Sequence, residues 1–309
     1  MADSPLGRTL LVANPAARSG HGAAGTDFAE RFLSSWPAAT EGYDVRRTSG
    51  PGDARALAAG AHDYDSVVAL GGDGVIHEVV GGLMQIEPEG RPQLGIVPLG
   101  SGNDYARTLG MARNDVEASL AQLVRGRVGS LEVGSVNGVP FMQTLSFGLD
   151  AAIALDTTAR RAHATSQEGS ALFVTSGLKI LSRARDGYPC VARFDAQEPR
   201  DLRTIIFAIQ VGPSYGGGFR ICPDADPADG LLDVCYNVSV PTIPHLLGLF
   251  GLARQGLHAR SRVVELQRIA HAEIDFQVEP PCQVDGEKLT GTHFDVDVIP
   301  HALRVILPR

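Results

Sequence analysis

A glycine-rich segment, Leu70–Val80, joins a run of apolar residues to a run with helical spacing. It begins Leu-Gly-Gly-Asp-Gly. Glycines let a phosphate group approach the backbone closely, and the first free N–H groups of a helix, together with its dipole, favour negative charge. The segment is therefore typical of a phosphate-binding turn.

Asp73 adds a carboxylate to this turn. A lone carboxylate beside phosphate is repelled unless a cation lies between them, so Asp73 indicates a metal ion, or its water shell, close to a nucleotide. The alternative is an ordinary strand-to-helix turn that Asp73 caps, which is common in α/β proteins. Taken alone, the turn leaves both interpretations open.

Two more polar loops and a threonine follow the other apolar runs of the first half. The loop Pro98–Arg107 contains two glycines, a hydroxyl and polar capping residues. The loop Asn14–Gly22 follows the first run, and Thr48 follows the second. In a parallel sheet all of these emerge at the carboxyl ends of strands, where such folds bind ligands. We therefore expect four strand-end loops to face one crevice, although none has a Walker or Gly-x-Gly-x-x-Gly pattern.

Two groups of carboxylates lie in the second half. Asp226 and Asp229 provide oxygen ligands of the kind that magnesium prefers, but Asp-Pro and Asp-Gly pairs are also usual in a loop before a strand. Asp285 and Glu287 flank a glycine, which predicts a hairpin turn. On the residues alone, a solvated turn and a hairpin turn are the favoured interpretations of these two groups.

The first 130 residues alternate between apolar runs and helical segments, which predicts an α/β domain with a parallel sheet. The expected strands are Thr9–Ala13, Tyr43–Val45, Ser66–Leu70 and Leu94–Val97. The expected helices are Ala24–Leu33, Ala54–Ala61, Ile76–Met84 and Asp115–Leu123.

From residue 131 to residue 300 the pattern predicts a β-rich antiparallel sandwich. Asn137 and Gly138 lie between two strand-like runs, Leu131–Val136 and Val139–Leu145, which is a strong hairpin signal. Other expected strands are Cys190–Phe194, Thr204–Val211, Leu231–Val240, Glu273–Val278 and Phe294–Ile299, and the expected helices are Ala171–Arg183 and Ile243–His258. The closing run, Leu303–Leu307, can return to the first domain, which residues 301–309 would then complete.

Composition narrows the classes of function. The 309 residues carry a net charge of −8 with scattered basic residues, which argues against a nucleic-acid partner. No apolar run approaches the roughly 20 residues that span a bilayer, so we expect only peripheral contact with membranes. The four cysteines show no Cys-x-x-Cys spacing, which fits free buried thiols in a cytoplasmic protein.

Together, the three loops resemble the diacylglycerol kinase-like catalytic domain that bacterial lipid kinases, sphingosine kinases and ceramide kinases share. That family has an Asn-Pro loop, then Gly-Gly-Asp-Gly-Thr-x-Asn-Glu, then Pro-x-Gly-Thr-x-Asn-Asp. The loop at Asn14 and the segments Gly71–Glu78 and Pro98–Asp104 match this order. Val75 and His77 replace the usual Thr and Asn, as an apolar residue and a His do in sphingosine kinases.

The resemblance extends to the C-terminus and implies roles for the carboxylates of the second half. Asp226, Asp229 and the Leu231 carbonyl match the segment that positions a magnesium ion in the family. The segment containing Asp285 and Glu287 matches the family's Asp-Gly-Glu motif, in which one carboxylate acts as general base. A lipid hydroxyl gains nucleophilicity as its proton is withdrawn. Which of the two carboxylates takes the proton stays open at this point.

The resemblance thus implies an ATP-dependent lipid kinase that uses Mg²⁺, with Asp73, Asp285 and Glu287 as catalytic residues. Its acceptor would be diacylglycerol or a sphingoid-type lipid at the membrane surface. The residues implied around ATP are Asn14, Thr48, Gly71, Gly72, Asp73, Gly74, His77, Glu78, Gly100, Ser101, Asn103 and Asp104.

Two other functions stay open. A kinase of NAD or of another small molecule also uses a Gly-Gly-Asp-Gly loop. A non-catalytic regulator that binds nucleotide or lipid is the alternative from another class, because Val75 and His77 alter two polar positions near the phosphates. For His77 itself, a helix N-terminal residue with a satisfied hydrogen bond is as good an interpretation as a nucleotide contact. The sequence leaves the oligomeric state open, a homodimer included.

Overall fold

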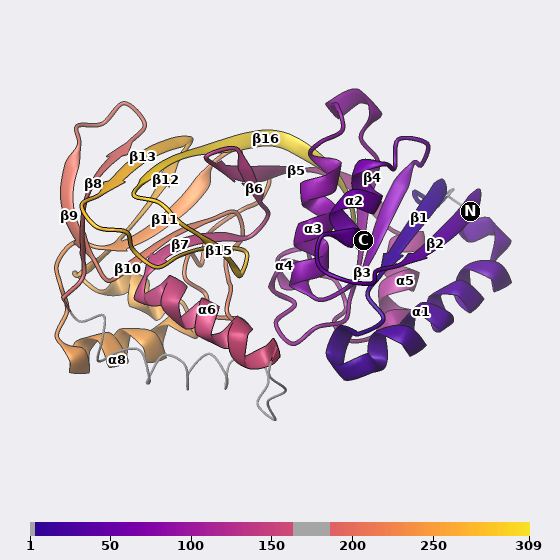
Figure 1. Ribbon diagram of the computed structural model, residues 1–309, viewed down its shortest axis with the longest axis horizontal. Coiled ribbons are helices and arrows are strands. Elements are labelled where there is room, and N and C mark those ends of the chain that lie inside the picture. Colours follow the sequence, from indigo (N-terminus) through magenta and orange to yellow (C-terminus); the bar gives the residue numbers. More distant parts are fainter. Residues whose placement is uncertain (1–3, 163–185) are drawn as a thin grey trace. The chain divides into compact units, whose positions relative to one another are not determined.

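The computed structural model describes residues 4–162 and 186–309 (Figure 1). The chain divides into two compact units, one of residues 1–131 with 301–309 and the other of residues 132–300. The sequence predicts the domain boundary between residues 130 and 131. Among the described residues, no helix combines the length and the apolar character that crossing a membrane requires.

A parallel sheet forms the centre of the first unit. Its strands lie in the order β2 (Gly42–Arg47), β1 (Arg8–Ala13), β3 (Ser66–Gly71) and β4 (Gln93–Pro98). The end of β16 (His293–Leu307) lies parallel beside β4, with Val305 opposite Leu94. All residues of β3 are buried, as expected for a strand covered on both faces. The four predicted strands and the predicted α/β class are confirmed.

The helices of the first unit connect these strands. They are α1 (Ala17–Ser35), α2 (Asp53–Ala59), α3 (Asp73–Leu83), α4 (Asp104–Thr108) and α5 (Val116–Val124). The four predicted helices are all present, and α5 begins where Asp115 accepts a hydrogen bond from the Ala118 N–H. The sequence did not predict α4, since five residues are too few for a periodic pattern. Short 3₁₀ helices lie at Pro37–Ala39, Pro88–Gly90 and, in the second unit, Leu257–Arg260.

The second unit is the predicted antiparallel sandwich. One sheet has the order β12 (Val264–Ile269), β11 (Leu232–Asn237), β10 (Ile206–Gln210), β7 (Thr144–Gly148), β14 (Cys282–Val284) and β15 (Glu287–Leu289). The other contains the first part of β16, β13 (His271–Phe276), β8 (Tyr188–Phe194) and β9 (Arg200–Thr204), and β5 (Arg127–Val136) pairs with β16 and with β6 (Val139–Phe141).

Aromatic rings fill the space between these two sheets. Phe147 of β7 lies 4.8 Å from Phe294 of β16, measured between ring centroids, and 5.2 Å from Phe276 of β13. Phe207 of β10 lies 6.2 Å from Phe194 of β8. Because these residues alternate with outward-facing ones along their strands, the two inner faces form one core.

Two helices cover the outer face of the first of these sheets. Leu149 and Ile153 of α6 (Leu149–Ala162) share a second apolar cluster with Leu246 and Leu249 of α8 (Ile243–Ala253). Figure 1 shows both helices on the same side of the unit. The helix predicted at 171–183 lies outside the described residues.

Several predicted bounds in this half were wrong. The helix predicted to reach His258 ends at Ala253, because Gly256 adopts the left-handed conformation with φ of 74°. The run Val139–Leu145 is two strands rather than one, since β6 ends at Phe141 and β7 begins at Thr144. Strands β9 and β12 were not predicted. The four cysteines are free and buried, as expected.

Candidate functional site

The turn between β3 and α3 is held against the loop after β4 by direct backbone contact. A Cβ added to Gly100 would lie 2.6 Å from the Cα of Gly72, so neither position has room for a larger residue facing the other. The Leu99 N–H donates to the Gly71 carbonyl at 2.7 Å. Gly74, the second residue of α3, is exposed, and a Cβ there would meet nothing within 4 Å. The start of α3 is therefore open to a ligand while its other side is fixed.

Asn103 and Asn114 shape the second loop. Asn103 is left-handed, with φ of 51°, and its Nδ2 donates to the Gly100 carbonyl at 2.8 Å and to Asn114 Oδ1 at 3.2 Å. The Gly100 N–H also donates to Asn114 Oδ1, at 3.1 Å. Among the described residues, the buried Oδ1 of Asn103 has no hydrogen-bond partner. An unpartnered buried acceptor suits a site that a ligand or its water completes. The sequence did not predict the role of Asn114. The one feature that could have indicated it is a polar side chain after a glycine-rich loop.

Asp73 and Asp104 bring two carboxylates together beside Gly102. A Cβ added to Gly102 would lie 2.8 Å from Asp73 Oδ2 and 3.4 Å from Asp104 Oδ2. Burial, and then the charge of Asp104, raise the pKa of Asp73 to about 6, although backbone N–H groups from Asn103 to Tyr105 oppose the rise. The Arg107 Nε lies 3.5 Å from Asp104 Oδ1. Asp73 therefore ionises less readily than an ordinary aspartate. A divalent cation bound between the two carboxylates would reduce the repulsion between their charges.

The loops after β1 and β2 lie at the same ends of their strands. The Asn14 N–H donates to the Leu70 carbonyl at 3.0 Å, which places this loop beside the end of β3. The Asn14 side chain makes a hydrogen bond within its own loop, because Oδ1 accepts from the Ala16 N–H at 2.9 Å. The Thr48 N–H donates to the Ala13 carbonyl at 2.8 Å. Strand ends thus hold all four predicted loops at one edge of the sheet, with Ser101 exposed among them.

Glu78 and His77 have surroundings that the sequence did not predict. The Glu78 carboxylate accepts hydrogen bonds from the N–H groups of Gly52, at 2.9 Å, and Ala54, at 3.1 Å. Because α2 begins at Asp53, Glu78 caps that helix and ties it to α3. His77 is 4% exposed and lies among the buried residues of α3. The structure therefore assigns Glu78 a structural contact within the first unit.

Asp285 and Glu287 of the second unit have very different environments. Asp285 occupies the tight turn between β14 and β15 with φ of 48°. Its carboxylate accepts from three consecutive backbone N–H groups, those of Met142 at 2.8 Å, Gln143 at 3.0 Å and Thr144 at 2.8 Å. These bonds explain why the chain breaks between β6 and β7. Asp285 thus fixes the turn.

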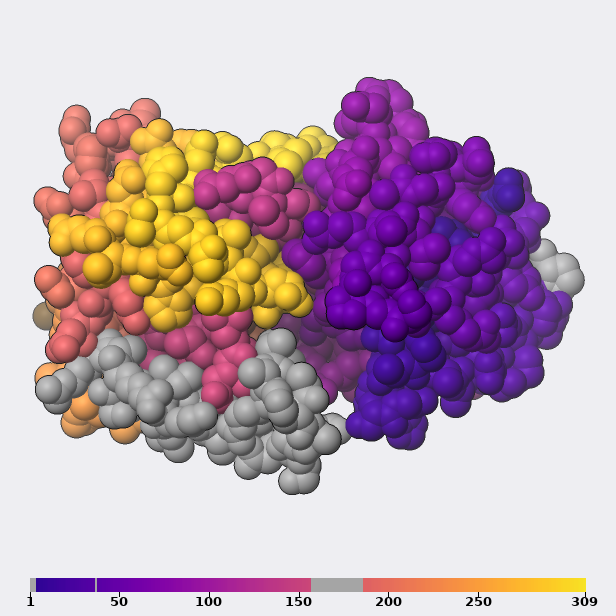
Figure 2. Space-filling model, in the orientation of Figure 1, coloured from indigo at the N-terminus to yellow at the C-terminus, as the bar shows by residue number. Residues whose placement is uncertain are grey.

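Glu287 is the first residue of β15, and it is exposed. The yellow end of the chain, which includes β15, forms part of the surface that faces the viewer in Figure 2. Gln283 links the turn to β7. Its Oε1 accepts from the Gly286 N–H at 2.6 Å, and its Nε2 donates to Ser146 Oγ at 2.7 Å. The sequence did not predict this role of Gln283. An exposed carboxylate next to a fixed turn has the properties of a general base.

The predicted magnesium segment is tied together mainly by its own backbone. Asp226 Oδ1 accepts from the Ala228 N–H at 3.1 Å, and Asp229 Oδ1 accepts from the Leu231 N–H at 3.0 Å. Asp229 also pairs with Arg268 at 3.2 Å. All of these contacts are usual in a loop.

Two buried acids that the sequence missed lie beside this segment. Glu132 accepts from the Gly230 N–H at 2.6 Å, and burial raises its pKa to about 7. Burial, and then the charge of Asp229, raise the pKa of Asp233 to about 6. Within the described part of the chain, Glu132 Oε1 and Asp233 Oδ2 have no hydrogen-bond partner. Carboxylate oxygens without a hydrogen-bond partner, close to the carboxylates of Asp226 and Asp229, are suitable ligands for a divalent cation. These residues therefore fit the predicted ion.

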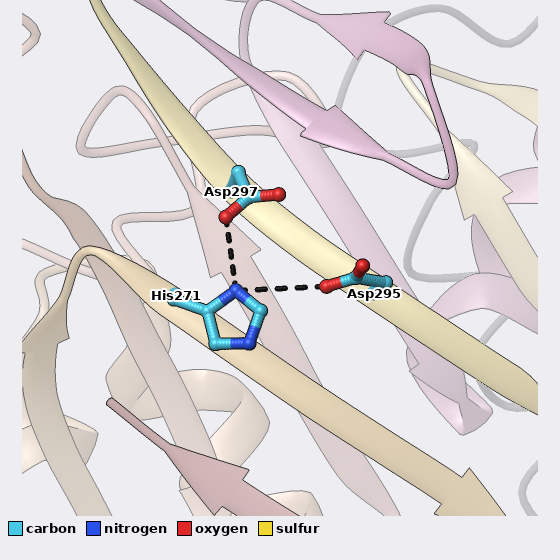
Figure 3. Close-up of side chains that lie close together, drawn as sticks. All are labelled: His271, Asp295 and Asp297. Atoms are coloured by element: carbon cyan, nitrogen blue, oxygen red, sulfur yellow. Dashed lines mark hydrogen bonds and ion pairs between the residues drawn. The ribbon is translucent and has the colours of Figure 1, made fainter. Parts of the chain in front are cut away.

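A third group of potential ligands is an ion pair. His271 Nδ1 lies 2.9 Å from Asp297 Oδ1 and 3.5 Å from Asp295 Oδ1 across strands β13 and β16 (Figure 3). The hydrogen bond to Asp297 is the largest of the effects that raise the pKa of His271. A ring that holds its proton more firmly between two exposed carboxylates is a poor metal ligand. We therefore do not count this group as a metal site.

Comparisons with known proteins agree with this arrangement. Residues 8–136 match the family model described as the diacylglycerol kinase catalytic domain, and residues 143–307 match the one described as the YegS C-terminal NAD kinase beta sandwich-like domain. Proteins named "Probable lipid kinase YegS-like" from Yersinia pestis and Yersinia pseudotuberculosis are 30% identical over 268 residues, covering 85% of this chain and 86% of theirs.

Solved structures show the same fold. The crystal structure of a diacylglycerol kinase from Bacillus anthracis superposes with a TM-score of 0.79, covering 99% of this chain and 98% of that chain. The two sequences are 19% identical, so this likeness concerns the fold alone.

Proposed function

The chain belongs to the diacylglycerol kinase catalytic domain family with a YegS-type second domain, and from this premise we propose that it transfers the γ-phosphate of ATP to a lipid hydroxyl. The observation that carries the phosphoryl-transfer part is the pair of carboxylates, Asp73 and Asp104, fixed beside the glycine turns at the carboxyl ends of β3 and β4. The lipid part rests on the family and on the names of the relatives.

The first unit would bind ATP at its strand-end loops. The open start of α3 supplies backbone N–H groups and a helix dipole for the phosphates, and the contact between Gly72 and Gly100 keeps two loops at a fixed spacing. Asn103 offers an unpartnered acceptor at the same place. The N–H groups at the start of α3 are preformed donors, which stabilise charge without reorganising during the reaction.

Magnesium fits two places in the chain. Asp73 and Asp104 would hold an ion near the phosphates, because a dication offsets both the burial and the charge of Asp104, which together raise the pKa of Asp73. Asp226, Asp229 and the Leu231 carbonyl would hold a structural ion, with Glu132 and Asp233 as neighbouring acids. When bound near ATP, the ion supplies neutralisation of phosphate charge.

Glu287 is the better candidate for the general base. Asp285 already accepts three backbone hydrogen bonds, whereas Glu287 is exposed on the strand that follows. In the proposed step the Glu287 carboxylate accepts the proton of the lipid hydroxyl, and the oxygen forms a bond to the γ-phosphorus. The bond from that phosphorus to the β,γ-bridging oxygen breaks, so ADP leaves. Asp285 then acts as a positioning residue.

A transfer assay tests this proposal. The protein is incubated with γ-labelled ATP and magnesium, and with separate panels of diacylglycerols and sphingoid bases in detergent micelles, NAD, and sugars. We expect label in a lipid and loss of transfer when magnesium is chelated.

The panel also separates the alternatives. Label in NAD or a sugar alone would identify a small-molecule kinase. The likeness of the second domain to an NAD kinase beta sandwich is the reason for including NAD in the panel. Binding of ATP without transfer to any acceptor would identify a regulator. Either result would contradict the lipid kinase proposal.

A further inference from the structure

Helix α8 is apolar on the side that faces away from its own unit. Its inner face packs Leu246, Leu249 and Ala253 into the cluster that also holds residues of α6. On the outer face, Ile243 is 38% exposed and Leu247 is 43% exposed. A helix that is hydrophobic on both faces normally lies in a core or at a membrane interface.

The outer face of α8 continues into the chain before it. Val238 and Val240 are 44% and 41% exposed, and Leu252 at the end of the helix is 43% exposed. Gly248 and Gly251 also face open space, since a Cβ added to either would meet nothing within 4 Å. Thus the helix keeps large apolar side chains exposed where folding alone would favour polar ones.

Basic residues border this apolar face. Residues 238–262 contain Arg254, Arg260 and Arg262 and no Asp or Glu, in a chain whose net charge is −8. All three arginines are exposed. None of the ion pairs found between described residues involves them, so no carboxylate in that part of the chain neutralises them.

We propose that residues 238–262, the α8 surface, dock the protein onto an anionic lipid bilayer. Exposed aliphatic side chains gain free energy by entering the interfacial region, and arginines at their border attract anionic head groups. This combination of exposed aliphatic side chains and arginines distinguishes a bilayer from a protein partner with an uncharged rim. The acid-free, basic stretch also contrasts with the net negative charge of the chain. The inference rests on the proposed lipid kinase function, since it gives the enzyme a route to a membrane-resident acceptor.

Vesicle binding tests the proposal without any catalysis. The full chain is sedimented with vesicles of phosphatidylcholine alone and with vesicles that contain phosphatidylglycerol, neither of which includes an acceptor lipid. We expect binding to the anionic vesicles, weaker binding to the neutral ones, and a decrease with salt. Leu247→Glu with Leu252→Glu should lower the partition coefficient at least about tenfold. Arg260→Gln with Arg262→Gln should lower it about fivefold for each arginine.

Val278→Glu is the matched control, because Val278 is 56% exposed in the same unit but outside the α8 surface. It should bind as the unchanged protein does. Equal binding of the Leu247→Glu, Leu252→Glu variant and the Val278→Glu variant would overturn the proposal. So would a dimer in light scattering that only the leucine substitutions dissociate, because the surface would then hold a second copy.

The kinase assay separates failure of this inference from failure of the proposed function. With a short-chain diacylglycerol below its critical micelle concentration, the leucine variant should keep the unchanged protein's rate, while its rate on vesicles falls. If the protein binds anionic vesicles but phosphorylates no lipid, the proposed function is contradicted and the proposed docking surface is supported. If the protein phosphorylates lipid in vesicles at a rate that does not depend on Leu247 or Leu252, only the proposed docking surface is contradicted.

Discussion

Asp285 and Glu287 lie two residues apart, and the structure gives their carboxylates different tasks. Three backbone N–H groups converge on Asp285, whereas Glu287 is exposed at the start of β15. The Asp-Gly turn could be predicted from residue types. The three hydrogen bonds could not, because their donors lie more than 140 residues earlier in the chain and local patterns carry no information on such pairs.

Replacement of Asp285 should therefore act mainly on stability. In Asp285→Asn the amide group turns a donor toward an N–H group, so at least one partly buried hydrogen bond is lost. We expect the free energy of unfolding to fall by about 1–3 kcal/mol, measured by urea denaturation. Asp201→Asn, at an exposed position of β9, should change it by less than about 0.5 kcal/mol. Equal stabilities of the two variants would contradict the structural role.

Asp150 gives a second prediction at this scale. Burial raises its pKa from 3.8 to about 7, and its Oδ2 has no hydrogen-bond partner among the described residues. Between pH 4 and pH 7 the folded state keeps a proton that the unfolded state has lost, so this residue destabilises the fold progressively as pH rises and fully above pH 7.

Asp150→Asn removes the ionisable carboxyl group and, with it, the free-energy cost of ionising that group in the folded protein. Relative to the unchanged protein, the variant should gain stability between pH 4 and pH 7, by up to about 4 kcal/mol, and the difference should stay constant above pH 7. Denaturation curves at several pH values measure it. A stability difference that does not vary with pH would show that the folded protein does not hold the proton.

At the scale of elements, the site depends on how closely two strand-end loops approach each other. The strands β3 and β4 and the helix α3 were all predicted from periodicity and glycine positions. The role of Glu78 was not, because capping of α2 depends on the packing of α2 against α3, which residue types do not reveal. The short helix α4 and the bracing by Asn114 escaped prediction for the same reason.

Gly100→Ala tests the contact between the loops. The new Cβ would lie 2.6 Å from the Cα of Gly72, so the loops must move apart. We expect a loss of about 1–3 kcal/mol in stability and at least about tenfold weaker binding of an ATP analogue in calorimetry. Gly90→Ala is the control, since its Cβ would meet only Ile86 at 3.9 Å. Unchanged nucleotide affinity in Gly100→Ala would argue against phosphate binding at this turn.

At the scale of the whole molecule, the last strand joins the first unit after the chain has formed the second. Leu303, Val305 and Ile306 are buried in the first unit, and Arg304 donates to the Arg91 carbonyl at 2.6 Å. The apolar closing run suggested this return. The sequence predicted two separate runs, Phe294–Ile299 and Leu303–Leu307, with Pro300 between them. The single strand β16 spans both, and His301 adopts a left-handed conformation within it.

Val305→Asp should therefore unfold the first unit even though the residue is four positions from the C-terminus. A buried unpaired carboxylate costs at least about 3 kcal/mol. Thermal unfolding followed by limited proteolysis measures the effect, and Arg309→Asp at the exposed end is the control. A variant as stable as the control would show that this strand contributes little to the first unit.

The central claim is that this chain phosphorylates a lipid hydroxyl with Glu287 as base, and a rate comparison tests it most directly. Glu287→Gln and Glu279→Gln make the same chemical change at two exposed glutamates of the second unit. With saturating ATP, magnesium and the preferred lipid, we predict that Glu287→Gln lowers kcat about 10²- to 10⁴-fold at unchanged ATP affinity, while Glu279→Gln has no effect. Equal rates of lipid phosphorylation in the two variants would contradict the account.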